Sequence, residues 1–585
     1  MAVSLPFPNE SHFRVFLQHC QKSLPGDLLF KDPSCGIEAD HRQFLQDVYT
    51  TRQTLLNGLP GTFDHRNLIH EEHPFICVLN QGNYSFIVAS FAVLILGGAV
   101  VPLSPSILPE EASHLMRKCQ STALMAGPTV WDRASTLKDY AASQQQDIHL
   151  LPIAIHSSLE DIAPSIDETM TIAPERPSML VFTSGTVGPP KGVVHARRLL
   201  ALPDTPPWPG TYLNCVSLWT VGAVRLIKHT LRARRIEIIA TDPAVLWARL
   251  RQGDIAFLAA VPPVWQGMME YFKKEVDHLP AAQRDKYLCG LRGVRTAIVT
   301  GGTLIPSRLR FWRDLGKALK LCYGATELGK VCLITGDDSD PDRNNCLGRA
   351  VVGTSIKLSE GDHGELLIKS PAVFSHYLND VAATKAAFTD DGYYRTGDLV
   401  SREGSNYFFH GRASTDFIKY HGYQIPILSL EQQLGEVAGV DEGYILAMPD
   451  EGCGYRAAAL IRLSKEAQAA TARLDLPSLR AQLADKVAAF MLPTALRFLE
   501  SGETIPRTIS GKIIRRDAAK CFFPLDDEGV CTAPDVQVWR ARPTVYHDGS
   551  ARAWDWAAWE CRDTGLNGLF RSLQNTMHAA FTLHL

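Results

Sequence analysis

The sequence predicts the α/β fold class: a large N-terminal domain of two α/β subdomains plus a small β layer, followed by a smaller α+β C-terminal domain. Helical patterns alternate with short apolar runs over residues 11–175, and a second alternating set follows over residues 236–321. This alternation is typical of βα units on a largely parallel sheet. From about residue 348 the apolar runs shorten and turn residues separate them, which predicts the β layer.

The expected strands are short apolar runs bounded by turn or polar residues. In the first subdomain they are Phe75–Leu79, Ala99–Val101 and Thr122–Ala126; in the second, Ile236–Ala240, Ile255–Val261, Ala297–Val299 and Leu319–Leu321. In the β layer they are Ile356–Leu358, Gly364–Ile368, the pair Leu399-Val400, and Tyr407–Phe409. We expect the acidic stretch Leu159–Arg176 to be an exposed connection and the proline-rich stretch Pro203–Pro209 to be a break between subdomains.

The chain length predicts more than one domain, because 585 residues exceed what one hydrophobic core normally supports. We place an N-terminal domain at residues 10–410 and a C-terminal domain at residues 411–523, the latter with a helix over Pro477–Phe490. Residues 524–585 carry four of the ten tryptophans and no motif. This Trp-rich extension has no assigned role and is either a packed extension or a loosely attached tail.

Charge and cysteine usage exclude several classes of protein. The formal net charge is -3 and no long block of like charge occurs, so no nucleic-acid partner is expected. The 13 cysteines are scattered and form no C-x-x-C pair. This pattern favours reduced thiols in an intracellular protein over a disulfide framework or a zinc site.

Phe86–Leu103 is about as long as a membrane span and carries no charge. Gly97-Gly98 divides it, so we expect a buried helix, a tight turn and a short strand rather than a span. The N-terminus lacks the apolar core of a secretory signal. The final Leu583-His584-Leu585 half resembles a peroxisomal tripeptide. We therefore expect a cytoplasmic location, with peroxisomal and mitochondrial locations as open alternatives.

The stretch Met179–His195 predicts a polyphosphate-binding loop. After an apolar strand end, three hydroxyl residues, three glycines, two prolines and one lysine fall within the ten positions Thr183–Gly192. Glycines let backbone N–H groups approach an anion closely, and Lys191 adds a positive charge. The loop differs from the Walker loop because Lys191 lies between Pro190 and Gly192. The alternative for this loop alone is an ordinary Gly/Pro turn between a strand and a helix.

Five further segments concentrate glycines and polar residues beside apparent strands. They are Thr300–Thr303, Leu321–Glu327, Tyr393–Leu399, Gly411–Ile425 and Ile505–Arg516. Together with the phosphate loop, and in this order, they resemble the adenylate-forming (AMP-binding) superfamily, which includes acyl-CoA synthetases. The resemblance covers about residues 10–520. It implies that a carboxylate attacks the α-phosphate of ATP to give an acyl-adenylate and pyrophosphate, and that a thiol then displaces AMP.

The resemblance also implies roles for individual residues in binding ATP. The phosphate-loop residues that would hold the β- and γ-phosphates are Thr183, Ser184, Gly185, Thr186 and Lys191. The residues that would enclose the adenine are Gly301, Gly302, Tyr323 and Gly324. Asp398 would accept hydrogen bonds from the ribose hydroxyls, and Arg412 could reach the same sugar.

The implied catalytic residues are Thr326, Glu327 and Lys512. Thr326 would donate to the α-phosphate, and Glu327 would help to hold Mg²⁺, which favours oxygen ligands and substrate phosphates. Lys512 would bridge the carboxylate and the α-phosphate as negative charge develops. Lys419 and Gly422 would belong to a segment that serves the thiol step with CoA after the mobile C-terminal domain rotates.

The segment Gly411–Ile425 narrows the resemblance to one group within the superfamily. Lys419 follows Arg412 by seven residues, where most members of the superfamily have six. The pattern Gly-Arg-x-Ser-x-Asp-x-Ile-Lys-x-x-Gly-Tyr resembles malonyl-CoA synthetases and related short-chain acyl-CoA ligases. Ser414 occupies the usual hinge position, and Asp416 is the alternative hinge.

The segments expected to line the acid pocket depart from the malonate-specific pattern. Those relatives have a His-x-His-Gly element and an arginine before the adenine tyrosine, whereas this chain has Trp219–Gly222 and Cys322. Losing that arginine removes the group best suited to bidentate carboxylate binding. Because Trp219 favours an apolar or aromatic acyl group, we expect a monocarboxylic acid rather than malonate. Arg225 and Lys228 could restore positive charge to this pocket, but we expect them on a solvent-exposed helix face.

The leading functional hypothesis is an acid–CoA ligase. The alternative is a stand-alone adenylation enzyme of secondary metabolism that loads a separate carrier-protein thiol in polyketide or peptide biosynthesis. No Gly-Gly-x-Ser carrier motif follows Lys512, so such a carrier would be a separate protein. A third hypothesis, a non-catalytic binding protein, is disfavoured because every phosphate- and ribose-binding position is filled, Lys512 included.

Overall fold

A computed structural model describes residues 3–24, 26–183, 191–202, 210–232, 234–343, 345–412, 417–420, 423–450, 454–469, 474–484, 486–487, 491–508, 512–526 and 531–539. The chain divides into two compact units. Unit 1 comprises Met1–Thr396 and Val400–Phe409, and unit 2 comprises Gly397–Leu399 and His410–Leu585.

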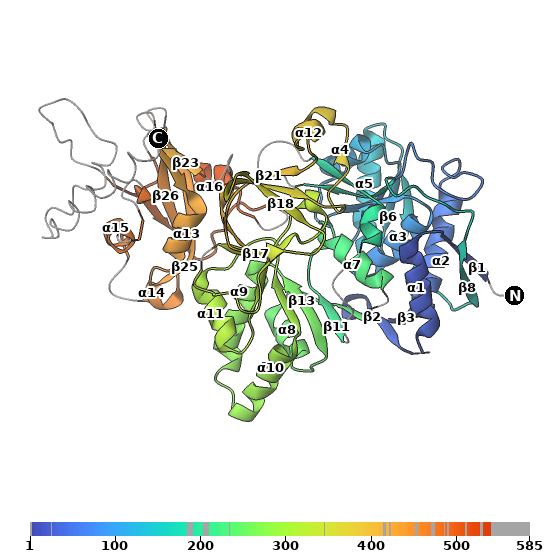
Figure 1. Cartoon of the computed structure of the whole chain (residues 1–585), viewed down its shortest axis with the longest axis horizontal. Coiled ribbons are helices and arrows are strands. Elements are labelled where there is room, and N and C mark those ends of the chain that lie inside the picture. Colours follow the sequence, from blue (N-terminus) through green and yellow to red (C-terminus); the bar gives the residue numbers. More distant parts are fainter. Residues whose placement is uncertain are drawn as a thin grey trace, which may run out of the picture. The chain divides into compact units, whose positions relative to one another are not determined.

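The first sheet of unit 1 carries the strands on both sides of the phosphate loop (Figure 1). Its order is β20 (His376–Tyr377), β10 (Gly192–Ala196), β9 (Pro177–Phe182), β5 (Ala99–Leu103), β4 (Phe75–Leu79), β6 (Ala123–Ala126) and β7 (His149–Pro152). The strands from β9 to β7 are parallel, whereas β10 is antiparallel to β9 and to β20. The associated helices are α2 (His41–Gly58), α3 (Tyr84–Ile95), α4 (Pro109–Lys118) and α5 (Trp131–Ser143).

The second sheet of unit 1 joins a parallel part to the antiparallel β layer. The parallel strands are β2 (Leu28–Asp32), β12 (Ile236–Ile238), β11 (Thr211–Asn214), β13 (Ile255–Ala260), β14 (Thr296–Val299) and β15 (Lys320–Tyr323), with β3 (Ile37–Asp40) antiparallel at the edge. Beyond β15 the order is β16 (Leu333–Ile334), β17 (Cys346–Ala350), β22 (Asn406–Arg412), β21 (Tyr394–Glu403), β19 (His363–Lys369) and β18 (Ser355–Glu360).

Helices flank the second sheet, and one of them connects it with the first sheet. They are α7 (Gly222–Leu231), α8 (Pro243–Leu250), α9 (Pro262–Tyr271), α10 (Ala281–Gly293) and α11 (Pro306–Asp314). The other helices of unit 1 are α1 (Ser11–Lys22), α6 (Arg198–Ala201) and α12 (Val381–Ala386). Helix α7 packs against α1 and α3, and its apolar side chains share one core with those of α3. Helix α7 therefore lies where the two subdomains meet.

The apolar stretch from Phe86 forms the predicted helix, turn and strand. Every residue of α3 is buried, and Gly97 takes the left-handed φ of +73° that a tight turn into β5 requires. Among the described residues, no helix is long and apolar enough to cross a membrane.

The prediction that Leu159–Arg176 is only an exposed connection is wrong. It contains β8 (Ile162–Asp167), which pairs in parallel with β1 (Val3–Pro8). Alternate side chains of β8 are half-buried, and the acidic residues and prolines of the surrounding stretch concealed this weak strand pattern from sequence analysis. Pro203–Pro209 lies outside the described residues.

Unit 2 is built on a mixed sheet (Figure 1). Its strands are β24 (Tyr423–Pro426), β23 (Phe417–Tyr420), β26 (Gly454–Leu463), β27 (Ala495–Phe498) and β28 (Gln537–Val538), and β25 (Val440–Asp450) pairs with β26. Its helices are α13 (Ile427–Gly435), α14 (Lys465–Ala469), α15 (Leu476–Ala484) and α16 (Arg515–Phe522). The helix expected over Pro477–Phe490 is thus α15, and residues 488–490 lie outside the described residues.

The described start of the Trp-rich extension belongs to the sheet of unit 2. Strand β28 pairs with β27, and the Trp539 ring lies 4.1 Å from the Arg480 guanidinium. Residues 540–585 lie outside the described residues. The predicted α/β class with a following α+β unit is confirmed, and the described cysteines are free thiols.

Candidate active site

The base of the phosphate loop is held by backbone pairing. Thr183 follows β9 and Lys191 precedes β10, and the Thr183 N–H donates to the Lys191 carbonyl at 2.9 Å. This hydrogen bond holds Thr183 next to Lys191 at the ends of β9 and β10. Ser184, Gly185 and Thr186 lie outside the described residues.

Lys191 is connected to Glu327 through a tyrosine that the sequence analysis did not select. The Lys191 ammonium lies 4.9 Å from the centre of the Tyr377 ring, and the Tyr377 hydroxyl donates to Glu327 Oε1 at 2.9 Å. Tyr377 is buried, and β20 holds it opposite Val193 of β10. The structure therefore brings the predicted phosphate lysine and the predicted Mg²⁺ ligand to one place.

A buried histidine fixes the turn that carries Thr326 and Glu327. This 3₁₀ turn, η4 (Thr326–Leu328), receives a 2.8 Å hydrogen bond from His195 Nε2 to the Thr326 carbonyl. His195 is fully buried on β10, and burial lowers its pKa to about 4. The imidazole is therefore neutral near pH 7, and it donates through Nε2. Gly329 follows with a φ of +66°, and a Cβ there would lie 3.1 Å from the imidazole.

Tyr394, on β21, also interacts with Tyr377 and Glu327. Burial raises its pKa, and the negative charge of Glu327 and a hydrogen bond with Tyr377 act in the same direction. Tyr394 therefore stays a neutral phenol beside the carboxylate.

The predicted adenine residues lie at the ends of two neighbouring strands. Strand β14 leads to Gly301, which has a φ of +77°, and the adjacent β15 ends at Tyr323. A Cβ on Gly324 would lie 3.0 Å from the Lys330 carbonyl oxygen, which explains the need for glycine there. Gly302 is exposed beside Gly301. Because parallel strands end at one sheet edge, Gly301 and Tyr323 are brought near each other.

Unit 2 contains the predicted ribose pair. Asp398 is buried, and the Arg412 Nε donates to its Oδ1 at 2.8 Å. Lys419 lies on β23, and Gly422, Ser414 and Asp416 lie outside the described residues. Lys512 is exposed and precedes α16, and its carbonyl accepts from the Thr508 N–H at 2.7 Å.

The predicted acid-pocket residues lie around the start of α7 and the end of β15. Gly222 begins α7, where a Cβ would lie 3.0 Å from the side chain of Val216. Trp219 lies against Gly82, and among the described residues its indole N–H has no hydrogen-bond partner. Cys322 is half-buried, and its thiol donates to the Val299 carbonyl at 3.2 Å.

The expectation that Arg225 and Lys228 face solvent is wrong. Lys228 is buried, and Arg225 is half-buried with its guanidinium 5.8 Å from the centre of the Phe257 ring. Both are carried by α7, which is covered by neighbouring elements on more than one face. Basic residues normally mark an exposed face, and the sequence offered no sign that this helix lies between subdomains.

Sequence reasoning did not select two residues of this region, namely His195 and Tyr377, and it favoured a solvent-exposed position for Arg225. His195 closes the phosphate-loop motif, so its place in the motif was the available signal. Tyr377 follows Phe374 in a segment without a recognised pattern, and only strand pairing reveals its position.

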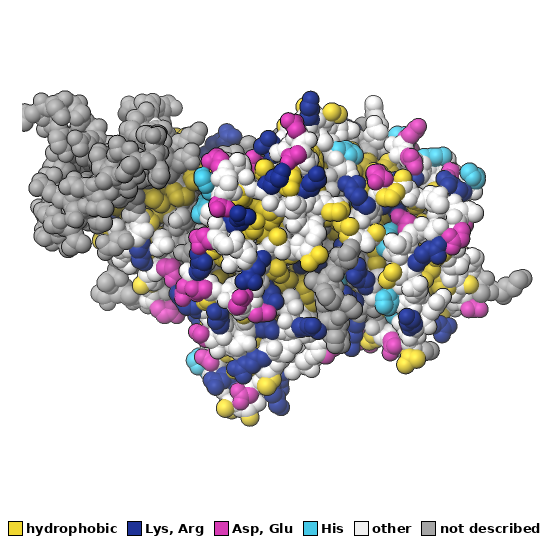
Figure 2. Space-filling view, viewed as in Figure 1, with side chains coloured by type: hydrophobic (Ala, Val, Ile, Leu, Met, Phe, Trp, Pro, Cys, Tyr) yellow, Lys and Arg dark blue, Asp and Glu magenta, His cyan; other side chains and the backbone are white. Residues whose placement is uncertain are grey.

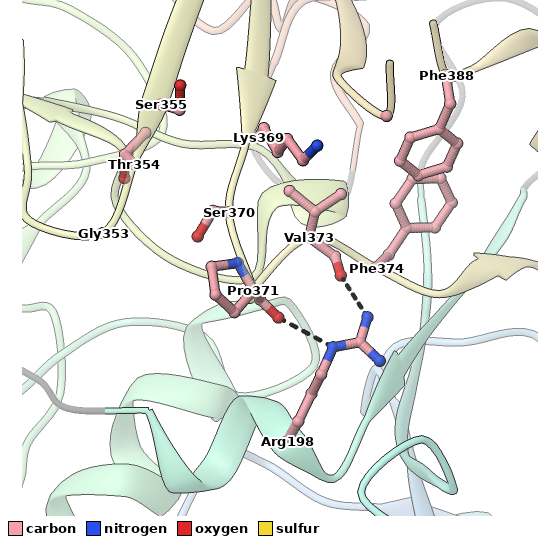
Figure 3. A pocket seen from close by; sticks show the side chains of 11 residues that line it. Arg198, Gly353, Thr354, Ser355, Lys369, Ser370, Pro371, Val373, Phe374 and Phe388 are labelled. Carbon is pink, nitrogen blue, oxygen red and sulfur yellow. Dashed lines mark hydrogen bonds between the residues drawn. The ribbon is translucent and has the colours of Figure 1, made fainter. Parts of the chain in front are cut away.

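A separate pocket of about 690 Å³ lies elsewhere on unit 1, and none of the predicted site residues lines it. Arg198 enters it and donates to the carbonyls of Pro371 and Val373, while Phe374 and Phe388 stack at 5.4 Å (Figure 3). On the visible face of unit 1, basic and acidic side chains are interspersed (Figure 2).

Comparison with known proteins identifies the family. The family model described as AMP-binding enzyme matches residues 66–378, more than half of the chain. The chain belongs to this AMP-binding enzyme family. The match includes the phosphate loop, the Tyr323 strand and Tyr377, and the predicted resemblance is confirmed.

Named relatives of this AMP-binding enzyme include ligases. An acyl-CoA ligase of Aspergillus oryzae is 30% identical over 519 residues, which covers 86% of this chain and 91% of the relative. A malonate–CoA ligase of Arabidopsis thaliana is 27% identical over 489 residues, covering 76% of this chain and 77% of the relative.

Solved structures share the fold of this AMP-binding enzyme. ATP-bound MatB from Rhodopseudomonas palustris has a TM-score of 0.68 at 19% identity, with 86% of this chain and 97% of that chain covered. The o-succinylbenzoate CoA synthetase of Bacillus subtilis with its acyl-adenylate intermediate has a TM-score of 0.69 at 18% identity, with the same coverage.

Proposed function

We propose that this enzyme uses ATP to convert a carboxylic acid into an acyl-adenylate and pyrophosphate, and then transfers the acyl group to CoA, giving acyl-CoA and AMP. Family membership supports the use of ATP, and relatives named as CoA ligases support the acceptor. The polar residues gathered in unit 1 support the first step.

The arrangement of Lys191, Tyr377 and Glu327 carries this proposal. A lysine that binds pyrophosphate oxygens and a carboxylate that binds their counter-ion must lie close together, and Tyr377 contacts both. The Tyr377 hydroxyl uses Oε1 of Glu327 and so fixes the carboxylate plane. Among the described residues, Oε2 accepts no hydrogen bond and is available to a ligand.

The residues present fit Mg²⁺. Among the described residues, no group of three or more His, Cys, Asp or Glu side chains could hold a metal ion. Mg²⁺ is commonly held by one or two carboxylates together with substrate phosphates and water, so Glu327 with ATP suffices. When bound, Mg²⁺ would offset the negative charge of the phosphates.

The remaining roles are assigned to side chains of both units. The β- and γ-phosphates are held by Thr183, Ser184, Gly185, Thr186 and Lys191. The adenine is enclosed by Gly301, Gly302, Tyr323 and Gly324. The ribose is bound by Asp398 and Arg412, and the CoA step is served by Lys419 and Gly422. Thr326 donates to the α-phosphate. Lys512 stabilises the charge that develops as the carboxylate attacks, because a preorganised cation is most effective in the transition state. Lys191 then retains the departing pyrophosphate.

Acid-dependent exchange of labelled pyrophosphate into ATP, followed by AMP release on adding CoA, tests the two steps separately. We expect exchange without CoA and AMP release with it. Exchange without AMP release on CoA, but with release on an acyl-carrier protein, would favour the carrier-loading alternative. No exchange with any short, medium or aromatic acid would refute acid activation.

A further inference from the structure

The backbone of Lys512 is paired with Thr508. The Thr508 N–H donates to the Lys512 carbonyl at 2.7 Å, and the Lys512 N–H donates to the Thr508 hydroxyl oxygen at 3.2 Å. The neighbouring residues Arg507 and Ile513 form an antiparallel bridge. Residues 506–508 and 512–514 are thus tied to each other, and we call them the Lys512 ladder. The place of this ladder in unit 2 depends on what holds its two sides.

The first side of the Lys512 ladder is anchored to strand β25. The Arg507 guanidinium donates to the Tyr444 hydroxyl at 2.6 Å, and it lies 5.5 Å from the centre of the same ring. The Tyr444 hydroxyl donates in turn to Glu442 Oε2 at 3.1 Å. A hydrogen bond and a cation–π interaction therefore hold this side of the ladder to β25.

The second side of the Lys512 ladder leads into α16, and a carboxylate of α13 holds the first residue of that helix. Arg515 begins α16, and its Nη2 donates to Glu431 Oε2 at 2.8 Å. The other oxygen of Glu431, Oε1, accepts from the Ile445 N–H of β25 at 2.9 Å. The Glu431 side chain is only 13% exposed and that of Arg515 27%. Water therefore screens this charged hydrogen bond less than it would at the surface.

The carboxylate of Glu431 joins two helices that pack on opposite faces of β25. Ile445 shares a core with α13, whereas the next residue, Leu446, shares another core with α16. Successive side chains of a strand point to opposite faces of the sheet. Because apolar burial is non-directional, it does not by itself fix where α16 lies along its face of the strand. The bond from Arg515 to Glu431 does, and Lys512 lies three residues before Arg515.

We propose that Glu431 is a positioning residue for Lys512: by holding Arg515, it places the Lys512 ammonium where negative charge develops during adenylation. This inference rests on the proposed function and deepens it, because it names what holds the cation of the first step. A preorganised cation is effective only when it is correctly placed, and a displacement of about 1 Å can cost about a hundredfold in rate. Glu431 acts through Arg515 and contacts no reactant itself.

Glu431→Gln tests this assignment. The amide keeps an oxygen that can accept from the Ile445 N–H, and it removes the negative charge that holds Arg515. Two half-reactions of the full-length enzyme are measured: kcat and KM for acid-dependent pyrophosphate exchange, and the rate of acyl transfer to CoA from preformed acyl-adenylate. Both are also measured for Lys512→Ala and for the double variant.

Glu503→Gln is the matched control within unit 2. The Glu503 carboxylate likewise accepts from one arginine, Arg497, and from one backbone N–H, that of Glu500. Among the described residues, Glu503 forms no hydrogen bond with the Lys512 ladder. The control therefore removes a comparable charge without touching the proposed connection to Lys512.

We expect Glu431→Gln to lower kcat for pyrophosphate exchange by about tenfold or more, since a misplaced cation stabilises the transition state poorly. The KM values for ATP and acid should not change, because only a transition-state interaction is lost. Acyl transfer to CoA should also be unchanged, and Glu503→Gln should change neither half-reaction. In the Lys512→Ala background, Glu431→Gln should cause no further loss, because the group that it positions is absent.

The double variant separates failure of this inference from failure of the proposed function. If Lys512→Ala slows adenylation but Glu431→Gln slows it by the same factor with and without Lys512, Glu431 does not act through Lys512. Equal losses in both half-reactions, matched by Glu503→Gln, would leave Glu431 with a structural role alone. No exchange by wild type with any acid would instead overturn the proposed function.

Arg515→Lys decides the matter if Glu431→Gln does not fold. This variant keeps the positive charge opposite Glu431 but loses the planar fork of the guanidinium. It should slow adenylation by a smaller factor than Glu431→Gln and leave acyl transfer to CoA unchanged. A folded Arg515→Lys enzyme with the wild-type rate of adenylation would refute the positioning role.

Discussion

The nucleotide side and the acid side of unit 1 differ in how their residues are arranged. On the nucleotide side, Lys191, Thr326 and Glu327 occupy the motif positions and are connected by polar contacts through His195 and Tyr377. On the predicted acid side, the motif positions hold Trp219 and Cys322, and the charge of Arg225, from another element, opposes the effect of burial on the pKa of the Cys322 thiol. In the proposed function, the first arrangement would bind ATP, with which every acid reacts, and the second would bind the acid.

This contrast leads to a kinetic criterion. A substitution on the nucleotide side should change the adenylation rate by the same factor for every acid, since all acids react with the same ATP. A substitution on the acid side should change the ratio of kcat/KM between acids.

Lys512→Ala should lower the rate of adenylation by roughly a hundredfold or more for every acid, on the scale of losing one preorganised donor to the transition state. It should spare transfer to CoA when preformed acyl-adenylate is supplied. Stopped assays of each half-reaction measure both steps. Lys520→Ala removes another exposed lysine of unit 2 and is the matched control. An equal loss in both half-reactions would contradict the assigned role of Lys512.

His195→Leu should weaken folding in a pH-dependent way. It removes the donor to the Thr326 carbonyl, and an unsatisfied buried carbonyl costs about 1–3 kcal/mol. In wild type the pKa of His195 is about 4 when folded, against 6.5 for the unfolded chain. The unfolded state therefore binds the extra proton between pH 6.5 and 4, and wild-type stability falls as the pH decreases through that window.

The leucine variant lacks this titration, so its stability should depend less on pH between 6.5 and 4, by at most about 1.4 kcal/mol per pH unit. Urea midpoints at pH 5 and pH 7 measure the difference. His195→Gln, which keeps a donor without the titration, separates the hydrogen bond from the protonation. A pH dependence identical in wild type and His195→Leu would contradict the buried neutral imidazole. The ratio of kcat/KM between two acids should be the same in both variants as in wild type.

Tyr377→Phe should raise the Mg²⁺ concentration needed for half-maximal adenylation by about tenfold, because groups that orient a metal ligand are typically worth that much in affinity. The ring that supports Lys191 is retained, so the loss is confined to the hydroxyl bonded to Glu327. Mg²⁺ titrations at fixed ATP provide the measurement. Tyr393→Phe removes a hydroxyl bonded instead to Ser355, and it serves as the control. If Tyr377→Phe changed the ratio of kcat/KM between acids and left the Mg²⁺ dependence unchanged, the proposed separation of a nucleotide side from an acid side would be wrong.

The sequence predicted what depends on local pattern. Alternating apolar runs located most strands of both subdomains, and the phosphate loop was located because its glycines, hydroxyls and lysine are contiguous. Partners distant in sequence could not be predicted. Tyr377 meets Glu327 because β20 pairs with β10, and Arg225 of α7 lies 5.8 Å from the centre of the Phe257 ring of β13. Such contacts follow from tertiary packing, which leaves no local signal.

Trp219→Phe should have the smallest effect and lies on the acid side. The aromatic ring against Gly82 is kept, while an indole N–H that has no partner among the described residues is removed. An unsatisfied buried donor costs about 1–3 kcal/mol, so the urea midpoint should stay the same or rise. Activity with butyrate and pentanoate should change by less than about threefold, since the apolar surface is preserved. If butyrate activity instead fell tenfold at unchanged KM for ATP, the indole N–H would be a direct contact to the acid.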